Sequence, residues 1–530
     1  MRRHQGDPPR QTCIVATVGL CRDTDWPSYL EALTEAGVDV LRLNLSHADA
    51  DYAKEAMVLA WSDRPDADER PLKPAVLVDL QGPKSRIGTL PGTGLDLQVG
   101  QTLALVPEGE ESAALAEGAV APQIPLPQPL GAEVMRALQG LAVKQPGLKP
   151  RVVFGDGEPV VEVRSLGRHH AQAVVVAGGR LGSRKGVTIR DVDPDLDPFP
   201  EKDQRDLDFC LQHRVDFVAV SFVRTAQDLH RVRAYIRDRL PTGVRPPRLV
   251  AKIETRSALE NLTEILAATD AILIARGDLG LQLGVEEVPR VQKQLVTAAR
   301  EAGKPVIVAT QMLESMVTAP APTRAEATDV FNAIVDGGDA VMLSGETSVG
   351  TRPCEVVATM DRLARKAEAW CDETSRVRRL RGAQEGDPGA GSSLGRIHEG
   401  MALAAVQLAD EIQARAIVCF TRSGRTAARL SRYRPEAPIL AFFRDESRAR
   451  AAVLSFGVHP VLLRDRPGEA PPLSQLVIRA REIMRRDWAL REGDALVITA
   501  GVDWPRGGTN AMQVVVEGVD GATVADGSRT

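Results

Sequence analysis

The chain is poor in aromatic residues and in cysteine, and it has no long apolar run. Aromatic side chains make up 4% of its 530 residues, and its six cysteines are scattered without paired spacing. Such cysteines do not suggest a disulfide framework, so a reducing cytoplasm fits best. No apolar stretch approaches the roughly 20 residues of a membrane-spanning helix, and the N-terminus lacks the apolar region of a secretion signal. We therefore expect a soluble, cytoplasmic protein without a membrane partner.

An excess of charge of one sign is also absent. The formal net charge is −5 with 26% charged residues, so the total does not favour nucleic acid as a partner, and any basic site must be local. Two nucleotide-binding motifs are missing too, because the chain has no GxxxxGK(S/T) loop and no GxGxxG after a strand. The length predicts roughly three or four domains.

The chain does contain eight short apolar runs along its first two thirds. Each run is rich in Val, Ile, Leu and Ala without clean alternation, and each is followed by a helix-like stretch. Parallel strands buried on both faces have this pattern. We predict an α/β fold built on a (β/α)8 TIM barrel. The runs begin at Cys13, Val38, Pro74, Phe217, Arg248, Ala271, Pro305 and Ala340.

The spacing of the runs divides the chain into four segments. Residues 1–83 hold the first three strands of the barrel, and residues 191–372 hold the other five. Between them, residues 84–190 are rich in Gly and Pro with short β-like runs, which predicts an inserted β-rich lid domain over the barrel mouth. Residues 373–530 begin with a flexible connector near Arg376 and predict a C-terminal α/β domain.

Polar residues stand where the barrel runs end. The active site of a TIM barrel lies at the C-terminal ends of its strands, so these side chains should converge on one mouth. They are Arg42, Asn44, Ser46, Asp79, Glu254, Asp278, Thr310 and Ser344.

Two of these residues are acids on neighbouring strands. Glu254 ends the fifth run and Asp278 ends the sixth. Carboxylate oxygens in this arrangement suit Mg²⁺ or Mn²⁺, with substrate and water as the remaining ligands. The alternative is that the acids only form ion pairs with Arg276 and Lys252, but two acids at adjacent strand ends favour the metal.

Cations accompany the acids. Lys252 precedes Glu254 by two residues, so both side chains point to the same side of the strand. A lysine placed there can neutralise charge on a transferring phosphoryl group, although an isolated lysine is more often part of a structural ion pair. Arg42 and Asn44 form a second same-side pair, and Arg42 can bind phosphate or carboxylate through two hydrogen bonds.

Smaller groups complete the predicted mouth. Gly277 offers an amide to a closely approaching carboxylate, and Thr310 offers a hydroxyl that can relay a proton, although a threonine at a strand end is usually a helix cap. Ser344 has the same two interpretations. In the insertion, Asp156 and Lys185 lie in glycine-flanked turns that can close on phosphates from above.

Several longer motifs of the chain resemble those of a known family, pyruvate kinase, and the resemblance extends from about Cys13 to Val524. The resemblance implies phosphoryl transfer from phosphoenolpyruvate to ADP, giving pyruvate and ATP, by a homotetramer. The matching segments, in the family's order, are RLNLSH, DLQGPK, EKD, AKIET, ARGDLG, KPVIVATQMLESM, PTRAEATDVFNAIVDGGDAVMLSGET and SGRTA.

The resemblance also implies roles for particular residues. Glu254 and Asp278 match the ligands of Mg²⁺ or Mn²⁺, and Lys252 matches the lysine that stabilises the transition state. The phosphoenolpyruvate positions match Arg42, Lys252, Gly277, Asp278 and Thr310, with Thr310 and Ser344 near the enolate face that is protonated. The nucleotide positions match Arg86, Lys185, Asn44 and Asp156.

The segment DLQGPK departs from family members that require K⁺. Those members hold the ion with residues matching Asn44, Ser46, Asp79 and the backbone of Leu80, and they carry Glu where this chain has Lys84. The segment is similar to that of the potassium-independent branch. We hypothesise that the Lys84 ammonium replaces the free cation, because a fixed positive charge beside Asp79 makes K⁺ redundant and repels it.

Two further departures concern the nucleotide and an effector. The turn from Gly19 to Arg22 replaces the usual proline-containing turn, and the loop GVDWPRGGTN lacks the aromatic-basic pattern of relatives activated by sugar bisphosphates. A phosphate cradle for a sugar-phosphate effector is nevertheless predicted between a strand and a helix of the last domain, with an ordinary capping turn as the alternative. Its residues are Thr421, Ser423 and Thr426.

Two other functions are weighed against this one. Mg²⁺-dependent lyases and aldolases handle pyruvate enolates on similar barrels, but they need no nucleotide lid. A regulatory scaffold without catalysis would require a broken site, whereas Lys252, Glu254, Asp278 and Thr310 are all present.

Overall fold

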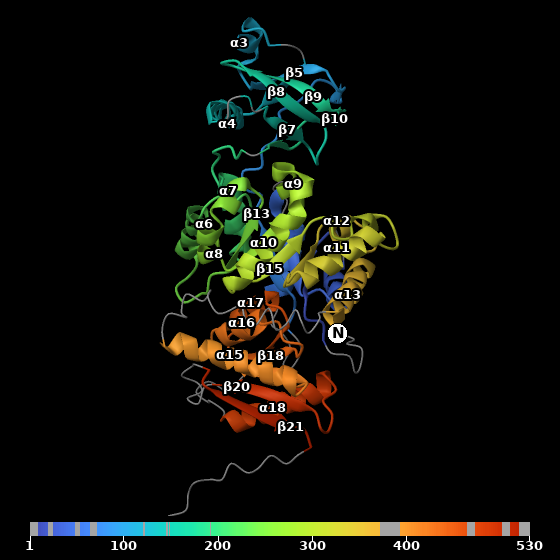
Figure 1. The fold of residues 1–530 in the computed structure, drawn as a ribbon, viewed down its shortest axis with the longest axis vertical. Coiled ribbons are helices and arrows are strands. Elements are labelled where there is room, and N and C mark those ends of the chain that lie inside the picture. The colour runs from blue at the N-terminus through green and yellow to red at the C-terminus, as the bar shows by residue number, and fades with distance from the viewer. Residues whose placement is uncertain are drawn as a thin grey trace, which may run out of the picture.

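The computed structural model shows three parts stacked along one axis, with the inserted domain at the top, the barrel in the middle and the C-terminal domain at the bottom (Figure 1). The residues that it describes are 9–19, 25–47, 53–63, 72–119, 122–144, 147, 149–190, 192–370, 393–463, 472–500 and 509–518.

Eight parallel strands form a closed barrel, which confirms the predicted fold class. The strands are β1 (Cys13–Thr17), β2 (Val40–Asn44), β3 (Ala75–Asp79), β12 (Phe217–Val220), β13 (Arg248–Ile253), β14 (Ala271–Ala275), β15 (Val306–Ala309) and β16 (Ala340–Leu343). Their order around the barrel is β1, β16, β15, β14, β13, β12, β3 and β2, and β2 closes the ring on β1. All eight strands fall within the apolar runs.

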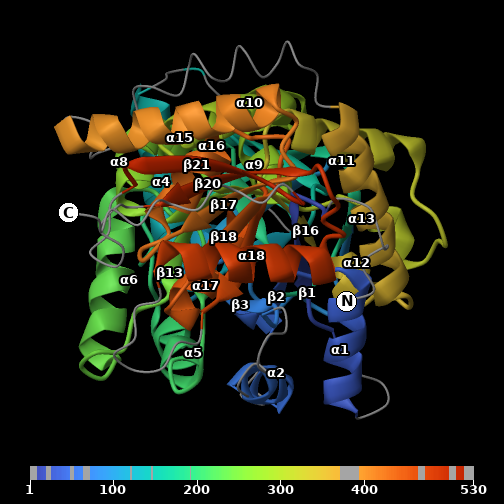
Figure 2. The ribbon, with the colours of Figure 1, turned by 90° about the horizontal axis from the view of Figure 1, so that it is seen from below.

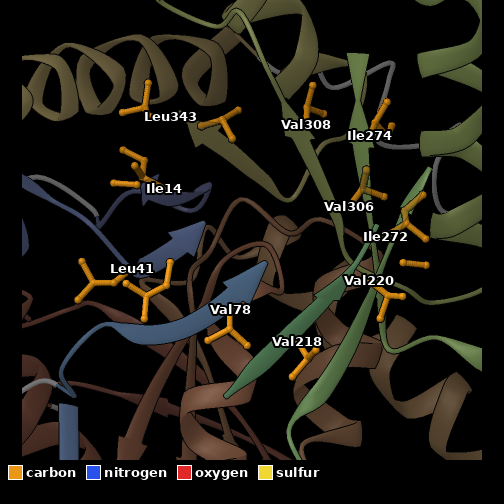
Figure 3. Close-up of a cluster of buried hydrophobic side chains, with 14 of the residues drawn as sticks. Ile14, Leu41, Val78, Val218, Val220, Ile272, Ile274, Val306, Val308 and Leu343 are labelled. Carbon is orange, nitrogen blue, oxygen red and sulfur yellow. The ribbon is translucent and has the colours of Figure 1, made fainter. Parts of the chain in front are cut away.

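Alternate residues of the barrel strands face opposite sides, as the two-residue period of a strand requires. Ile272 and Val308 belong to the outward set, which packs against the surrounding helices and is drawn in Figure 3. Leu77 and Val250 belong to a separate cluster inside the barrel. Both sets are fully buried, which explains why the runs do not alternate between apolar and polar residues.

Helices surround the barrel strands. The helix α11 (Arg324–Val335) begins where it does because Thr323 and Glu326 form a capping box, in which each side chain accepts a hydrogen bond from the other's backbone N–H. The other helical elements of the barrel are α1 (Trp26–Ala36), η1 (Leu45–His47), α2 (Ala53–Asp63), α5 (Glu201–Cys210), α6 (Ala226–Arg239), α7 (Arg256–Glu260), α8 (Leu262–Ala268), α9 (Arg276–Leu283), η2 (Val285–Glu287), α10 (Val288–Glu301), η3 (Glu314–Val317), α12 (Gly345–Ser348) and α13 (Pro353–Trp370).

The inserted domain is a small β-rich unit. Its main sheet has the order β11, β7, β8, β9, β5 and β6, and a second sheet pairs β10 with β4. Its core includes Leu103, Ile124 and Phe154 from the sheet and Leu138 from a helix. The elements are β4 (Leu95–Leu97), β5 (Thr102–Pro107), α3 (Glu111–Ala116), β6 (Gln123–Leu126), α4 (Leu130–Lys144), β7 (Arg151–Phe154), β8 (Val160–Leu166), β9 (Ala171–Ala177), β10 (Gly179–Leu181) and β11 (Val187–Ile189).

The C-terminal domain is a five-stranded sheet between helices. The strand order is β19, β18, β17, β20 and β21, and only β21 is antiparallel to its neighbour. Figure 2 shows α15 and α18 on opposite sides of this sheet, and each covers its own apolar cluster. The elements are α15 (Ser393–Glu411), β17 (Ala416–Phe420), α16 (Arg425–Arg432), β18 (Ile439–Phe443), α17 (Glu446–Ala451), η4 (Ala452–Leu454), β19 (Val458–Leu462), α18 (Leu473–Asp487), β20 (Ala495–Ala500) and β21 (Ala511–Val516).

The C-terminal domain closes the lower end of the barrel. Leu454 packs into the cluster inside the barrel, and Arg450, fully buried, donates hydrogen bonds to Asp216 just before β12. The expected connector near Arg376 lies outside the described residues, and the boundaries at 83/84 and 190/191 stay predictions. None of the described helices combines the length and the apolar character needed to cross a bilayer.

Candidate active site

Three strands place charged side chains together at the barrel mouth. Arg42 on β2, Asp79 on β3 and Lys252 on β13 occupy the inward phase of their strands. Arg42 Nε and Nη2 lie 2.8 and 2.6 Å from Asp79 Oδ2, and Lys252 Nζ lies 3.3 Å from Asp79 Oδ1. Asp79 is 1% exposed. One buried carboxylate therefore joins the two cations that the sequence predicts for phosphate chemistry.

Ser221 is a site residue that the sequence analysis missed. Its hydroxyl accepts a hydrogen bond from Lys252 Nζ and donates one to the carbonyl of Leu80, each over 2.7 Å. The run FVAVSF contained the signal, because Ser221 is the polar residue that directly follows β12. Ser221 thus fixes both the ammonium group and the backbone after β3.

The buried charges shift one another's pKa. Burial by itself raises the pKa of Asp79, but the charges of Lys252 and Arg42 outweigh it and hold that pKa below its usual value. Burial by itself lowers the pKa of Lys252, yet Asp79, Glu254 and Asp278 raise it well above its usual value. Lys252 is therefore a permanent cation at neutral pH.

Glu254 and Asp278 are the two carboxylates of the mouth. Burial, together with the charge of Asp278, raises the pKa of Glu254, while Lys252 opposes that shift. Glu254 Oε2 accepts a hydrogen bond of 2.7 Å from the backbone N–H of Phe222, whose φ of 53° is left-handed. Phe222 was also missed by the sequence analysis. Of the alternative ion pairs, the one with Arg276 does not form, because Arg276 pairs with Asp329 at 2.7 Å. The one with Lys252 does form, since Lys252 Nζ lies 2.9 Å from Glu254 Oε1.

The donor set fits a divalent ion held jointly with a ligand. Glu254 Oε1 is buried without a hydrogen bond, although Lys252 Nζ lies 2.9 Å away. This oxygen, which pairs with the Lys252 ammonium and lies next to Asp278, suits a hard cation such as Mg²⁺ or Mn²⁺. Within the described residues no group of three or more His, Cys, Asp or Glu side chains can hold a metal ion. A metal here would therefore take its remaining ligands from substrate and water.

The turn after β15 meets the start of α9. Thr310, with a left-handed φ of 70°, accepts a hydrogen bond of 2.9 Å from the N–H of Gly277 through its hydroxyl oxygen. Arg276 donates to the carbonyl of Thr310 at 2.7 Å and so holds the turn in place. The predicted glycine amide and threonine hydroxyl are thus brought together, and the amide that we expected to face a carboxylate is bonded to Thr310.

Three other predicted residues lie at strand ends where they take part in local turns. Asn44 Oδ1 accepts a hydrogen bond from the N–H of Ser46 at 3.2 Å. The N–H of Ser344 donates to Glu346 Oε2 at 2.7 Å at the start of α12. Glu346 is fully buried and also accepts from the N–H of Leu313 at 3.0 Å.

A cleft of about 350 Å³ separates the mouth from the inserted domain. Glu254 and Asp278 line the barrel side of the cleft, and Arg86, Asp156 and Lys185 line the side of the inserted domain. Arg86 donates to the carbonyl of Arg184 at 3.1 Å, which ties the two ends of the inserted domain together. The structure thus places the predicted nucleotide residues of the insertion opposite Glu254 and Asp278, whereas Asn44 is not among the lining residues.

A side chain of α5 holds the segment after β3 in place through hydrogen bonds. Asp203 accepts hydrogen bonds from the N–H groups of Gln81 at 3.1 Å and Gly82 at 2.8 Å. Gly82 has a left-handed φ of 66°, and a Cβ there would come within 2.8 Å of Ser221 Cβ, so only glycine fits. Lys84, which follows, is exposed and lines the cleft. Asp79 instead contacts the side chains of Arg42, Lys252 and Ser221, so the structure does not show Lys84 in contact with Asp79 as we hypothesised.

The three residues of the predicted phosphate cradle make different contacts in the C-terminal domain, and the cradle itself stays a prediction. Thr421 is buried and accepts from the N–H of Gly424 at 3.0 Å, and Thr426 Oγ1 lies 2.6 Å from Thr509 Oγ1. Ser423 instead lines a pocket between the barrel and the C-terminal domain. The departures at 20–22 and 501–508 lie outside the described residues.

The fold and the site together define a TIM-barrel protein with an inserted domain over a mouth where buried carboxylates and cations converge. Two family models match the chain: "Pyruvate kinase, barrel domain" over residues 9–357 and "Pyruvate kinase, alpha/beta domain" over residues 399–515.

Several curated proteins are similar over nearly the whole chain. The pyruvate kinase of Methylorubrum extorquens is 36% identical over 506 residues, which cover 95% of this chain and 97% of that protein. A pyruvate kinase of Agrobacterium vitis is 38% identical over 96% of both chains. The pyruvate kinase of Thermotoga maritima is 33% identical over 96% of this chain and 99% of its own. The chain therefore belongs to the pyruvate kinase family, and its class of activity is phosphoryl transfer.

Proposed function

We propose that this enzyme transfers the phosphoryl group of phosphoenolpyruvate to ADP and releases pyruvate and ATP. The observation that carries the proposal is the buried network of Arg42, Asp79 and Lys252 beside Glu254, opposite a lid with two cations. A lyase or aldolase does not need the cations of the lid, and a scaffold without catalysis would not need Arg42, Lys252 and Glu254 together at the barrel mouth.

The chain's own residues account for positioning and for charge. Phosphoryl transfer has little covalent chemistry for a protein to perform, so orientation and electrostatic stabilisation dominate. Lys252 keeps its charge because of Asp79 and Glu254, and it can stabilise charge on the transferring group. Arg42 orients an anionic substrate. Arg86 and Lys185 bind the phosphates of the nucleotide from above.

Different residues would bind the metal ion and donate the proton. Glu254 and Asp278 would hold Mg²⁺ or Mn²⁺, which when bound would neutralise charge on phosphate oxygens. Thr310 accepts a hydrogen bond from Gly277, which leaves its own hydroxyl proton for donation toward the enolate. Ser344 lies at the end of the neighbouring strand, β16.

The lysine is the sharpest test of this proposal. We expect Lys252→Met to reduce kcat at least about 1,000-fold, because an uncharged side chain cannot stabilise the transferring group. Pyruvate formed from phosphoenolpyruvate is measured in a coupled assay with and without ADP. Lys293→Met, which removes an exposed lysine of α10, is the matched control.

The outcomes of that assay separate the three functions. Pyruvate formed only with ADP supports the kinase, and pyruvate formed equally without ADP indicates a lyase-like reaction. No turnover by the wild-type enzyme indicates a scaffold, and an unaltered rate in Lys252→Met would overturn the proposed mechanism.

We further propose that the enzyme works without K⁺. The support is the segment DLQGPK and the position of Lys84 in the cleft beside the mouth. The rate in K⁺-free buffer with a tetramethylammonium salt should match the rate with K⁺ within about twofold, because a fixed ammonium supplies the charge. Lys84→Glu should introduce a dependence on K⁺. A wild-type enzyme that is inactive until K⁺ is added would contradict this proposal.

A homotetramer is the assembly that we propose. An argument for self-association is that β21 is a sheet edge with Met512 and Val514 exposed, because such edges tend to pair. Size-exclusion chromatography with light scattering measures the mass directly, and a monomeric mass at micromolar concentration would contradict the proposal.

A further inference from the structure

Thr17, the last residue of β1, is a buried polar residue inside the barrel. It is 3% exposed and pairs in register with Arg42 of the neighbouring strand β2. Its side chain points inward, because Cys13 and Val15 of the same strand belong to the cluster inside the barrel and alternate residues of a strand share a face. The other inward residues of β1 are therefore apolar, and the Thr17 hydroxyl finds its partners on other strands.

The Thr17 hydroxyl joins the strands on both sides of β1. Its oxygen accepts a hydrogen bond of 2.7 Å from Arg42 Nη1 on β2, and it donates one of 2.8 Å to the carbonyl of Leu343 on β16. A guanidinium group can only donate and a carbonyl can only accept, so the direction of both hydrogen bonds is fixed. The Leu343 carbonyl thus orients the hydroxyl, and the hydroxyl orients Arg42.

Thr17 and Asp79 hold different parts of the Arg42 guanidinium. Asp79 Oδ2 lies 2.8 Å from Nε and 2.6 Å from Nη2, whereas Thr17 contacts Nη1. Each nitrogen of the guanidinium therefore has an oxygen partner, and the plane of the group is fixed. Because each Nη carries two N–H groups, each can still donate one hydrogen bond to an anionic substrate.

The backbone at Thr17 is attached to the segment that carries Ser344. Thr347, a buried residue of α12, donates a hydrogen bond of 2.9 Å from its hydroxyl to the carbonyl of Thr17. A Cβ at Gly19 would come within 2.1 Å of the carbonyl oxygen of Ser348, so the chain after β1 lies directly against α12. Thr17 thus links Arg42 to the end of β16, where Ser344 precedes α12.

Packing alone does not explain a hydroxyl at this position. Valine differs from threonine by a methyl group in place of the hydroxyl, and an apolar side chain would suit the cluster inside the barrel. The hydroxyl instead serves the two groups that it contacts, Arg42 Nη1 and the Leu343 carbonyl. A hydrogen bond to a charged group contributes more than one between neutral groups.

We propose that Thr17 is a positioning residue for phosphoenolpyruvate, because it holds the Arg42 guanidinium in the orientation that binds this substrate. The inference rests on the proposed function, in which Arg42 orients the anionic substrate. Thr17 acts through Arg42 and does not act on the nucleotide, for which the cations of the inserted domain are proposed.

Steady-state kinetics of Thr17→Val and Thr17→Ser test the proposal. We expect Thr17→Val to raise the KM for phosphoenolpyruvate at least about tenfold, because Arg42 loses a hydrogen bond to its charged group. The KM for ADP and kcat should stay within about threefold, because the nucleotide residues and Lys252 are unchanged. Thr17→Ser keeps the hydroxyl and should keep the KM for phosphoenolpyruvate within about twofold of the wild type.

The chain offers a matched control on α13. Thr359 also donates from its hydroxyl to a carbonyl, that of Glu355, and accepts from an arginine, Arg362, each over 2.9 Å. Thr359→Val should leave all three kinetic constants unchanged. Circular dichroism verifies that each variant is folded, and Thr17→Ala, which removes the same hydroxyl, replaces Thr17→Val if that variant does not fold.

A double-mutant cycle shows whether the effect of Thr17 passes through Arg42. In the Arg42→Met background, adding Thr17→Val should weaken phosphoenolpyruvate binding less than about twofold further. Isothermal titration calorimetry with phosphoenolpyruvate measures this affinity even where turnover is slow. An equal factor in both backgrounds would overturn the proposal.

The failure of this inference differs from the failure of the proposed function. A wild-type enzyme that forms pyruvate only with ADP, with an unchanged KM for phosphoenolpyruvate in Thr17→Val, would overturn the role of Thr17 alone. A wild-type enzyme that neither binds nor converts phosphoenolpyruvate would overturn the proposed function and this inference with it.

Discussion

At the scale of single residues, the site depends on an ammonium group held by three oxygen atoms. Lys252 Nζ lies 2.7 Å from Ser221 Oγ, 2.9 Å from Glu254 Oε1 and 3.3 Å from Asp79 Oδ1. The two acids keep it charged, and the neutral hydroxyl fixes its direction without adding charge. Ser221 is thus a positioning residue, because it acts through Lys252.

We predict that Ser221→Ala lowers kcat about 10- to 100-fold, since a hydrogen bond to a charged group contributes about 1.5–3 kcal/mol. The KM for ADP should remain unchanged, because the nucleotide residues belong to the lid. Steady-state kinetics measure both constants, and Ser455→Ala, a substitution in the C-terminal domain, is the control. A rise in KM with an unaltered kcat would contradict this positioning role.

At the scale of secondary-structure elements, one carboxylate couples the start of α5 to the loop after β3. Asp203 is 1% exposed and accepts two backbone hydrogen bonds from that loop. Burial raises the pKa of Asp203 to about 6; the charge of Asp206 adds to this shift, whereas the hydrogen bonds from Gly82 and Gln81 oppose it. The loop leads directly to Lys84 and Arg86 in the cleft.

This pKa predicts a pH dependence of stability with a definite sign. A raised pKa means that the folded state keeps the proton longer than the unfolded chain, so the contribution of Asp203 to stability is largest below about pH 4. That contribution decreases as the pH rises from about 4 to about 6. Urea midpoints of the wild type should therefore fall relative to those of Asp203→Asn over this range. Parallel curves for the two proteins would contradict the assignment.

At the scale of the whole molecule, a buried ion pair joins the C-terminal domain to the base of the barrel. Arg450 is fully buried and bonds to Asp216, to Ser62 Oγ at 2.8 Å and to the carbonyl of Pro74 at 2.9 Å. Its partners precede β3 and β12. The two domains are thus connected at the strand starts, at the opposite end from the chemistry.

We predict that Arg450→Met lowers the free energy of unfolding by about 3–5 kcal/mol, because it leaves Asp216 buried without its cation. Urea unfolding measures the change. Arg237→Met, at an exposed pair, should cost less than about 0.5 kcal/mol. Adding Asp216→Asn should recover part of the loss, and equal instability of the single and double variants would contradict the explanation.

The sequence by itself determined the barrel and several of the charged side chains that meet at its mouth. Buried parallel strands must be mostly apolar on both faces, so β1 and its seven partners appear as apolar runs without regular alternation. The two-residue period of a strand also required Lys252 and Glu254 to face the same side, and the C-terminal ends of parallel strands meet at one mouth. Local pattern was sufficient for these features.

Only the tertiary structure decided what holds those groups in place. Ser221, Asp203 and Arg450 are distant in sequence from their partners, and nothing in their own segments specifies those contacts. The division of Thr421, Ser423 and Thr426 among different environments likewise depends on how the C-terminal domain packs below the barrel. A sequence pattern indicates which face of a strand or helix each residue occupies. Hydrogen bonds and charge balance, in contrast, form between elements that come into contact only when the chain is folded.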